Sequence, residues 1–325
     1  MVILSDIQSA RTRLRGITVH TALIEFKLCA DDPRRFYLKP ENQQPIGAFK
    51  LRGAYNKIAT LSEEDRRRGV ITYSSGNHAQ GVAYAARAMG VRAVIVMPEN
   101  APAIKREATA ALGAEIVLVG PSSAERQLKA EELAAQRGYV IIPPFNDEQI
   151  IAGQGTIGLE ILEDLPEVET VLAPVGGGGM ISGVATAIKL SRPSVKVIGV
   201  EPELAADAQA SLRAGKIVEF SAGEVSQTMA DGLRTQSIGA INFEHIRKYV
   251  DDIVTVTEDE IRDAVRLLAA NPKTVAEPSG AVAVAGFLFH RDQLPKTKIN
   301  VAIISGGNID PKMLEEFCRG SAFSS

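Results

Sequence analysis

Residues 170–190 read TVLAPVGGGGMISGVATAIKL: an apolar run, four consecutive glycines and then a helical pattern. The run Thr170–Val175 is nearly all apolar, as expected of a strand in a sheet that is covered on both faces. The glycines Gly176–Gly179 have no Cβ atoms, so their N–H groups can approach a ligand closely at the positive N-terminus of the next helix. This stretch predicts a strand of a parallel sheet followed by a phosphate site. A tight turn, the structural alternative, needs only one or two glycines.

The same order of strand and helix repeats along most of the chain. Eight short β-rich stretches are predicted strands: Gly69–Tyr73, Ala93–Met97, Glu115–Val119, Tyr139–Ile142, Thr170–Val175, Val195–Glu201, Asp252–Val256 and Ile299–Ser305. Seven longer stretches have helical patterns: Asn77–Ala88, Ala101–Leu112, Ala124–Arg137, Asp147–Leu162, Gly179–Leu190, Glu258–Ala269 and Ser279–Phe289. This alternation predicts an α/β fold with open, mostly parallel sheets and helices on both faces. Residues 203–249 interrupt it, and long irregular segments are often functional.

Composition narrows the class of protein. The 325 residues carry 36 Lys and Arg against 39 Asp and Glu, and the net charge of −3 offers no basic field for nucleic acid or anionic lipid. We therefore expect a small-molecule partner or a second copy of the chain. The length fits about two domains. The longest apolar stretch, Gly280–Phe289, is about half of the ~20 residues that a membrane span needs.

Thiol and imidazole groups are scarce. Cys29 and Cys318 lie far apart, without the neighbouring Cys or His residues of a metal site, and the four histidines are scattered. Neither a disulfide framework nor a zinc site is indicated, and the N-terminus lacks a signal-peptide pattern. A cytoplasmic location is expected.

The glycine loop raises the question of which phosphate it binds. A dinucleotide fingerprint needs GxGxxG, and Ser182 stands where the third glycine belongs, although Glu201 does end the next strand. No Walker pattern occurs in the sequence. A single phosphate, as on a monophosphate cofactor, therefore fits the loop better than a pyrophosphate. A nicotinamide-dependent oxidoreductase stays an alternative.

A second motif, GAFKLRGA at residues 47–54, places Lys50 between Phe49 and Leu51. A lysine chosen at random is a solvated surface charge. Beside a phosphate and apolar walls, however, the Lys50 amine would be kept partly neutral, and Schiff-base chemistry requires a neutral amine.

Four motifs together resemble a known family. The lysine motif, SSGNHAQG at 74–81, the four glycines and SGGN at 305–308 are similar to those of the fold type II pyridoxal-phosphate enzymes, whose fold is like that of the tryptophan synthase β subunit. They most resemble the serine racemase and serine/threonine dehydratase branch. The resemblance runs from Ile17 to Leu314. It implies a large pyridoxal-phosphate-binding domain from residues 1–61 and 147–325, a small mobile domain from 62–146, and a homodimer.

The resemblance also implies an activity. A dehydratase would convert L-threonine or L-serine to a 2-keto acid and ammonia. The alternatives are a serine racemase with side elimination, a threo-3-hydroxyaspartate dehydratase, and a non-catalytic protein that binds the cofactor. Because the last helix ends near Cys318, we expect no C-terminal regulatory domain of the kind found in feedback-inhibited threonine dehydratases.

The family's cofactor-binding roles transfer to matching positions. Lys50 would form the Schiff base, Phe49 would pack on the pyridine ring, Asn77 would bond the phenolic oxygen and Ser305 would meet the ring nitrogen. The remaining cofactor-binding positions are the phosphate loop and one acidic residue: Gly176, Gly177, Gly178, Gly179, Met180 and Glu277.

The substrate would bind at the loop that heads the helix 77–88. Its members are Ser74, Ser75, Gly76, Asn77 and His78, whose N–H groups can bind a carboxylate, although Ser and Asn before a helix are also ordinary N-caps. In the racemases of this family, a serine at the place of Ser75 is the second acid/base, on the side of the cofactor opposite the lysine. Arg126 lies where racemase-like members carry an arginine that can bind a second carboxylate of the substrate. Alternatively, Arg126 is an ordinary charged residue on the surface of a helix.

Glu201, Ala205 and Asp207 have the spacing at which racemase-like members bind a divalent cation through two carboxylates and a carbonyl. Such oxygen ligands suit Mg²⁺, or Ca²⁺ or Mn²⁺. Without the resemblance, these residues would read as a solvated acidic loop.

Overall fold

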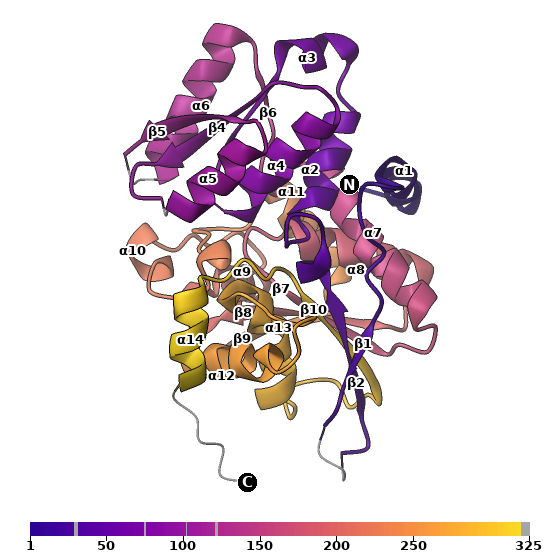
Figure 1. The fold of residues 1–325 in the computed structure, drawn as a ribbon. Coiled ribbons are helices and arrows are strands. Elements are labelled where there is room, and N and C mark those ends of the chain that lie inside the picture. The colour runs from indigo at the N-terminus through magenta and orange to yellow at the C-terminus, as the bar shows by residue number, and fades with distance from the viewer. Residues whose placement is uncertain (29–31, 75, 102, 121–122, 320–325) are drawn as a thin grey trace.

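The computed structural model describes residues 1–28, 32–74, 76–101, 103–120 and 123–319, so Ser75 and Cys29 lie outside it. Two sheets form the framework, one above the other in Figure 1. One has six strands in the order β1-β2-β10-β7-β8-β9, and the other has four in the order β5-β4-β3-β6. The predicted α/β fold with two mostly parallel sheets is confirmed.

The six-stranded sheet contains strands from both ends of the chain: β1 (Ile24–Phe26), β2 (Arg35–Pro40), β7 (Thr170–Pro174), β8 (Lys196–Pro202), β9 (Asp252–Val256) and β10 (Ile299–Ile304). β1 pairs antiparallel with β2, and all the other pairs are parallel. The apolar strands β10 and β7 lie in the middle of the sheet, where both faces are covered.

Helices cover both faces of this sheet because alternate strand residues point to opposite sides. In β7, Leu172 packs in a core with α12 (Glu258–Ala269) and α13 (Pro278–Phe289). Its neighbours Val171 and Ala173 pack in a second core with α7 (Glu148–Asp164), α8 (Gly179–Ser191) and α11 (Ala240–Tyr249).

The four-stranded sheet is parallel throughout and lies within residues 70–141. Its strands are β3 (Val70–Tyr73), β4 (Ala93–Pro98), β5 (Glu115–Val119) and β6 (Val140–Ile141). Its helices are α3 (Glu63–Arg68), α4 (Asn77–Ala88), α5 (Ala103–Ala111) and α6 (Ser123–Arg137). Ala54 and Ile58 of α2 (Lys50–Ala59) also pack in the core of this sheet. The domain boundaries at 61/62 and 146/147 stay a prediction.

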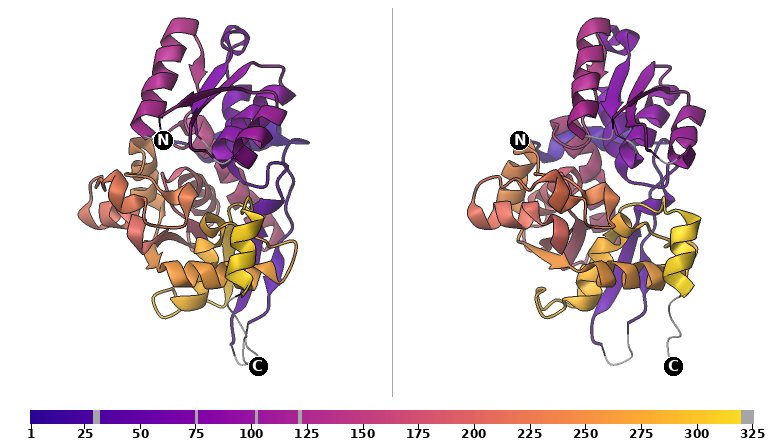
Figure 2. Two further views of the ribbon diagram at one scale, coloured as in Figure 1. Left: turned by 60° about the vertical axis from the view of Figure 1, so that its left-hand side comes forward. Right: turned by 90° about the vertical axis from the view of Figure 1, so that its left-hand side faces the viewer.

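The predicted elements agree with the structure to within two residues at either end. Residues 203–249 contain no strand; they fold into η2 (Glu203–Ala205), α9 (Asp207–Ala214), α10 (Ala222–Val225), η3 (Asp231–Leu233) and α11. The remaining elements are α1 (Leu4–Leu14), η1 (Glu41–Gln43) and α14 (Pro311–Arg319). Figure 2 shows α10 and α14 on the lower, six-stranded half. In the part of the chain that the structure describes, no helix combines the length and apolar character needed to cross a bilayer.

Candidate active site

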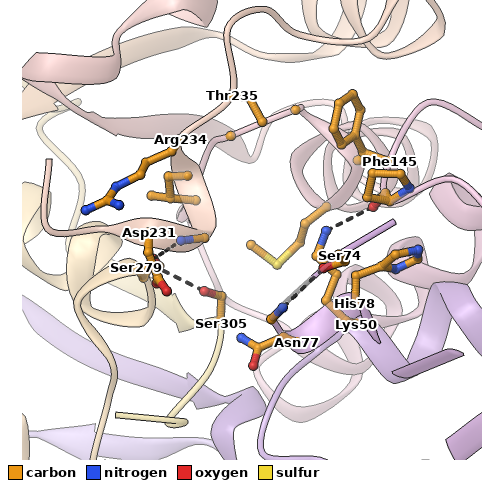
Figure 3. A pocket seen from close by; sticks show the side chains of 18 of the residues that line it. Lys50, Ser74, Asn77, His78, Phe145, Asp231, Arg234, Thr235, Ser279 and Ser305 are labelled. Atoms are coloured by element: carbon orange, nitrogen blue, oxygen red, sulfur yellow. Dashed lines mark hydrogen bonds between the residues drawn. The ribbon is translucent and has the colours of Figure 1, made fainter. Parts of the chain in front are cut away.

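A cavity of about 240 Å³ lies at the carboxyl ends of strands from both sheets. Tyr73 at the end of β3, Pro174 at the end of β7 and Ser305 directly after β10 all line it. Ligands of open α/β sheets bind at this edge. Figure 3 shows Lys50 and His78 on one side of the cavity, with Asp231 and Ser305 across from them.

Lys50 is the first residue of α2, and its side chain points into the cavity (Figure 3). The preceding N–H group, that of Phe49, donates to the carbonyl oxygen of Ser305 at 3.0 Å and so anchors the start of the helix. The Lys50 Nζ donates to the Pro144 carbonyl oxygen at 2.9 Å and lies 5.3 Å from the centroid of the Phe49 ring. Protein atoms around the amine disfavour its charged form and lower the pKa of Lys50 to about 8. A neutral, nucleophilic fraction is therefore available near neutral pH.

The glycine loop lines the cavity at the N-terminus of α8. Gly178 is the N-cap with φ +89°, a conformation that glycine adopts without strain, and no side chain caps the helix. The first N–H groups of α8 are thus available to an anion. A Cβ at Gly177 would lie 2.3 Å from the Phe145 ring, so glycine is also required for space. This cradle suits the phosphate of a monophosphate cofactor.

The loop before α4 offers a second N-terminus. Gly76 is its N-cap and makes no side-chain cap, so the alternative of a Ser or Asn N-cap is not what the described residues form. The Gly76 N–H donates to Ser74 Oγ at 3.2 Å. The His78 Nε2–H donates to the Ile142 carbonyl at 3.0 Å, and burial together with the charge of Lys50 lowers the pKa of His78 to about 3. His78 is neutral and fixes the loop. Ser75 lies outside the described residues.

Asn77 joins elements that are far apart in the sequence. Its amide nitrogen donates to Glu277 Oε1 at 2.6 Å, and its oxygen accepts from Asn308 Nδ2 at 2.7 Å. Burial and the charge of Asp231 raise the pKa of Glu277 to about 7, although the bond from Asn77 acts in the opposite direction. Ser305, also buried, donates weakly to the Ser279 carbonyl at 3.4 Å. These contacts hold polar groups at defined points of the cavity wall.

Other predicted residues differ in their relation to the cavity. Phe49, Met180 and Arg126 line it, and burial lowers the pKa of Arg126. Glu201, next to the last residue of β8, and Asp207, the first residue of α9, instead lie buried near each other outside the lining.

Glu201 has a structural partner. Its carboxylate accepts the N–H groups of Ala208 at 3.0 Å and Gln209 at 2.8 Å, so it caps α9. Neither Asp207 oxygen has a hydrogen bond of good geometry, and burial raises the pKa of Asp207 to about 7 despite nearby amides. Among the described residues no cationic side chain pairs with either carboxylate, and two buried carboxylates so placed fit a cation chemically. Within the described ranges, however, no three His, Cys, Asp or Glu side chains are grouped to hold a metal.

Sequence reasoning missed several residues that line the cavity. Gln154 of α7 is 1% exposed, and its Oε1 atom has no hydrogen-bond partner. Lys105 and Asp231 form an ion pair at 2.8 Å between α5 and η3. The GQGT stretch at 153–156 could have indicated a functional position at Gln154, since small and polar residues are unusual inside an apolar helix. A lone Lys or Asp carries no such signal.

Two sheets whose strands end at one cavity, a lysine of lowered pKa in that cavity and a glycine loop at a helix N-terminus define a class of α/β enzymes that hold a phosphorylated cofactor beside a lysine. The family model described as "Pyridoxal-phosphate dependent enzyme" matches residues 18–306. The chain belongs to this family, and the predicted fold type II membership and pyridoxal-phosphate cofactor are confirmed.

Three similar proteins are informative. An L-threonine ammonia-lyase of Thermotoga maritima is 48% identical over 97% of this chain and 78% of that protein. An L-threo-3-hydroxyaspartate ammonia-lyase of Saccharomyces cerevisiae is 41% identical over 97% of this chain and 96% of that protein. The structure of maize serine racemase is 36% identical and matches with a TM-score of 0.91, covering 97% of this chain and 96% of that one.

Proposed function

We propose that the protein is a pyridoxal-phosphate-dependent ammonia-lyase that converts L-threonine or L-serine to a 2-keto acid and ammonia. The observation that carries this proposal is the position of Lys50 in one cavity with two helix N-termini that have no side-chain cap. One N-terminus suits the cofactor phosphate and the other the substrate carboxylate. The 48% identity to a threonine ammonia-lyase supports the same reaction.

The lining residues would hold the cofactor as the motifs predict. Gly176, Gly177, Gly178 and Gly179 with the Met180 N–H would bind its phosphate, Phe49 would pack on its ring, and Asn77, held by Glu277, would bond its phenolic oxygen. Ser305 would meet the ring nitrogen. A hydroxyl there stabilises a protonated nitrogen less than a carboxylate does, which favours elimination over long-lived carbanions.

The chain's own groups would direct the proton transfers. Bound pyridoxal phosphate supplies an electron-withdrawing ring that stabilises negative charge on the substrate Cα. Lys50, with its lowered pKa, would take the Cα proton. The β-hydroxyl would then leave with one proton as water, so that the substrate loses its Cα proton and its hydroxyl together as one water molecule. The resulting enamine would add water to give the keto acid and ammonia. The N–H groups at the start of α4 would hold the substrate carboxylate.

Two alternative activities have specific support. The likeness to maize serine racemase favours racemisation, for which Ser75 would return a proton to the opposite face of Cα. The likeness to the yeast enzyme favours 3-hydroxyaspartate as substrate, whose second carboxylate Arg126 would bind through its planar guanidinium.

A divalent cation, Mg²⁺ or alternatively Ca²⁺ or Mn²⁺, is proposed at Glu201, Asp207 and the Ala205 carbonyl. The support is the buried Asp207 carboxylate, neither oxygen of which has a hydrogen bond of good geometry, since a cation would supply a strong partner. The homodimer, the mobile small domain and the cytoplasmic location stay predictions.

One experiment tests these assignments together. The protein is incubated with L-threonine, L-serine and threo-3-hydroxyaspartate, with and without Mg²⁺, while keto acid and D-serine are measured. We expect keto acid from at least one substrate and a loss of at least a thousandfold in Lys50→Ala, because the proton-transfer group is gone. Keto-acid formation retained by Lys50→Ala would refute the role of Lys50.

The same assay separates the alternatives. Ser75→Ala should abolish any D-serine formation and keep elimination, whereas equal loss of both would argue against a second base. Asp207→Asn should remove any stimulation by Mg²⁺.

A further inference from the structure

Four charged side chains are buried together beside the helix that carries Lys50. We call them the Arg52 cluster: Lys39 of β2, Glu41 of η1, Arg52 of α2 and Glu160 of α7. Each is at most 6% exposed. Two cations face two anions, so the formal charges cancel. None of these side chains lines the cavity, and the proposed reaction uses none of them.

The Arg52 guanidinium is held on both sides by carboxylates. Its Nε and one terminal nitrogen donate to the two oxygens of Glu41 at 2.7 and 2.8 Å. Both terminal nitrogens donate to Glu160 at 2.7 and 2.9 Å, and Thr156 Oγ1 accepts at 3.0 Å. Lys39 Nζ reaches Glu160 at 2.6 Å. A planar fork bonded in this way has a defined direction as well as a defined position.

Through Arg52, the cluster binds the first turn of α2, which also contains Lys50. Residues two apart in a helix point to nearly opposite sides, so Arg52 extends away from the cavity that Lys50 enters. The other side of this turn is tied by the Phe49 N–H to the Ser305 carbonyl at 3.0 Å. The first turn of α2 is therefore fixed from two directions.

Stability alone does not explain the cluster. Buried ion pairs are offset by the free energy of desolvating the charges, and apolar replacements of similar volume are often as stable. What an apolar group cannot supply is orientation. The close contact of α2 with α7, where a Cβ at Gly153 would lie 2.6 Å from the Arg52 carbonyl oxygen, also leaves the helix little freedom to shift.

We propose that Arg52 is a positioning residue, which through Glu41 and Glu160 fixes the first turn of α2 so that the Lys50 amine meets the reacting atoms. The link to catalysis rests on the proposed function. The positioning of the Lys50 amine by Arg52 does not depend on the proposed function, because it concerns only where the amine lies in the cavity.

The test compares Arg52→Lys, which keeps the charge and loses the fork, with Lys57→Arg. Lys57 lies on the same helix and pairs with Asp147 at 2.6 Å outside the cluster, so it is a matched control. In Arg52→Lys we expect kcat to fall by about ten- to a hundredfold, since misplacement by about 1 Å has effects of this size. KM should change less than twofold, and Lys57→Arg should behave as the wild type.

A second readout does not depend on turnover. After removal of the cofactor, acylation of Lys50 is followed by mass spectrometry across pH 6–10. If α2 shifts, water reaches the amine and the pKa of Lys50 rises from about 8 towards its ordinary value. A rise of about one unit lowers the neutral fraction at pH 8, and hence the labelling rate, about fivefold.

Glu160→Gln provides a test if Arg52→Lys does not fold, because Glu41 still binds the guanidinium in this variant. We expect kcat and the Lys50 labelling rate to fall in Glu160→Gln as well, but by less than in Arg52→Lys. Wild-type kcat and labelling in the folded variants would overturn the proposal. So would a lower melting temperature with an unchanged Lys50 labelling profile, which would mean a merely structural role. A wild type that forms no keto acid would contradict the proposed function instead, while the labelling would still test the positioning.

Discussion

His78 is buried at the start of α4, where its neutral form donates a hydrogen bond. Its Nε2–H donates to the Ile142 carbonyl, and a second proton would add a charge near Lys50 in a site with little water. Burial lowers the pKa of His78 to about 3, whereas the unfolded chain has the ordinary value of 6.5. Between these two values the unfolded state binds the extra proton and the folded state does not.

The expected result is a loss of stability in acid. As the pH falls below 6.5, the free energy of unfolding should decrease by up to about 1.4 kcal/mol per pH unit through His78. Urea unfolding at pH 7, 6 and 5 measures it. In His78→Gln, whose amide can still donate to Ile142, this part of the slope should vanish. The difference between the two slopes isolates His78 from the other groups that titrate, and equal slopes would contradict the assignment.

At the residue scale, the sequence predicts the groups that belong to short motifs. Lys50, Asn77 and the four glycines each lie in a run whose composition is unusual for a surface loop, so the sequence alone predicts that they belong to a site. The burial of Lys39 and Arg52 could not be found in this way, although Arg52 lies in the same motif as Lys50. A charged residue predicts exposure, and their burial depends on partners as far as 121 positions away, as in the pair of Lys39 with Glu160.

At the element scale, the helix pair α7 and α8 supports the phosphate loop. A Cβ at Gly183 would lie 2.2 Å from the Ile151 carbonyl oxygen and 2.5 Å from the Gly155 nitrogen, and both are backbone atoms of α7. Backbone in a buried helix has little room to move away. The small residues therefore let α8 lie close to α7, and this position sets where the N-terminus of α8 and its glycines meet the cavity.

Gly183→Ala should separate the two helices. We expect a loss of about 1–3 kcal/mol in the free energy of unfolding, although alanine is the better helix former, because overpacking outweighs propensity here. Cofactor affinity, measured by titrating the cofactor-free protein, should also fall. Gly223→Ala in α10 is the control, since the nearest atom to its Cβ would be 3.9 Å away. If Gly183→Ala were as stable as Gly223→Ala, the packing account would be wrong.

Helices and strands could be predicted from the sequence where their apolar residues follow a clear periodic pattern. The helix Glu258–Ala269 and the strand Asp252–Val256 were predicted with the bounds that the structure has. A clear apolar face and the capping box of Thr257 with Glu260 mark the start of that helix. β2 was missed, because its RFYLKP sequence carries charges at both ends and Lys39 is buried only through its ion pairs. The short helices of residues 203–249 were missed since they are stabilised by tertiary contacts rather than by a periodic pattern.

At the scale of the whole molecule, strands of the two sheets end at the same cavity, and a charged contact joins helices of the two halves beside it. Lys105 of α5 pairs with Asp231 of η3 at 2.8 Å, and both residues line the cavity. The pair therefore bridges the four-stranded half and the six-stranded half at the wall of the cavity. If the small domain moves as predicted, its separation from the six-stranded half would break this pair, and the pair would oppose that motion.

The contribution of this pair is measurable by exchanging its charges. Both side chains are partly exposed, so the attraction is worth at most about 1 kcal/mol, or about fivefold in a binding constant. Asp231→Lys and Lys105→Asp each place like charges together and should raise KM for the preferred hydroxy amino acid about five- to tenfold. The doubly exchanged protein restores opposite charges and should recover most of this loss, which a double-mutant cycle quantifies. If the double exchange were no better than the worse single variant, the two residues would act separately, for example through the effect of Asp231 on Glu277, and the bridge between the halves would have no part in closing the cavity.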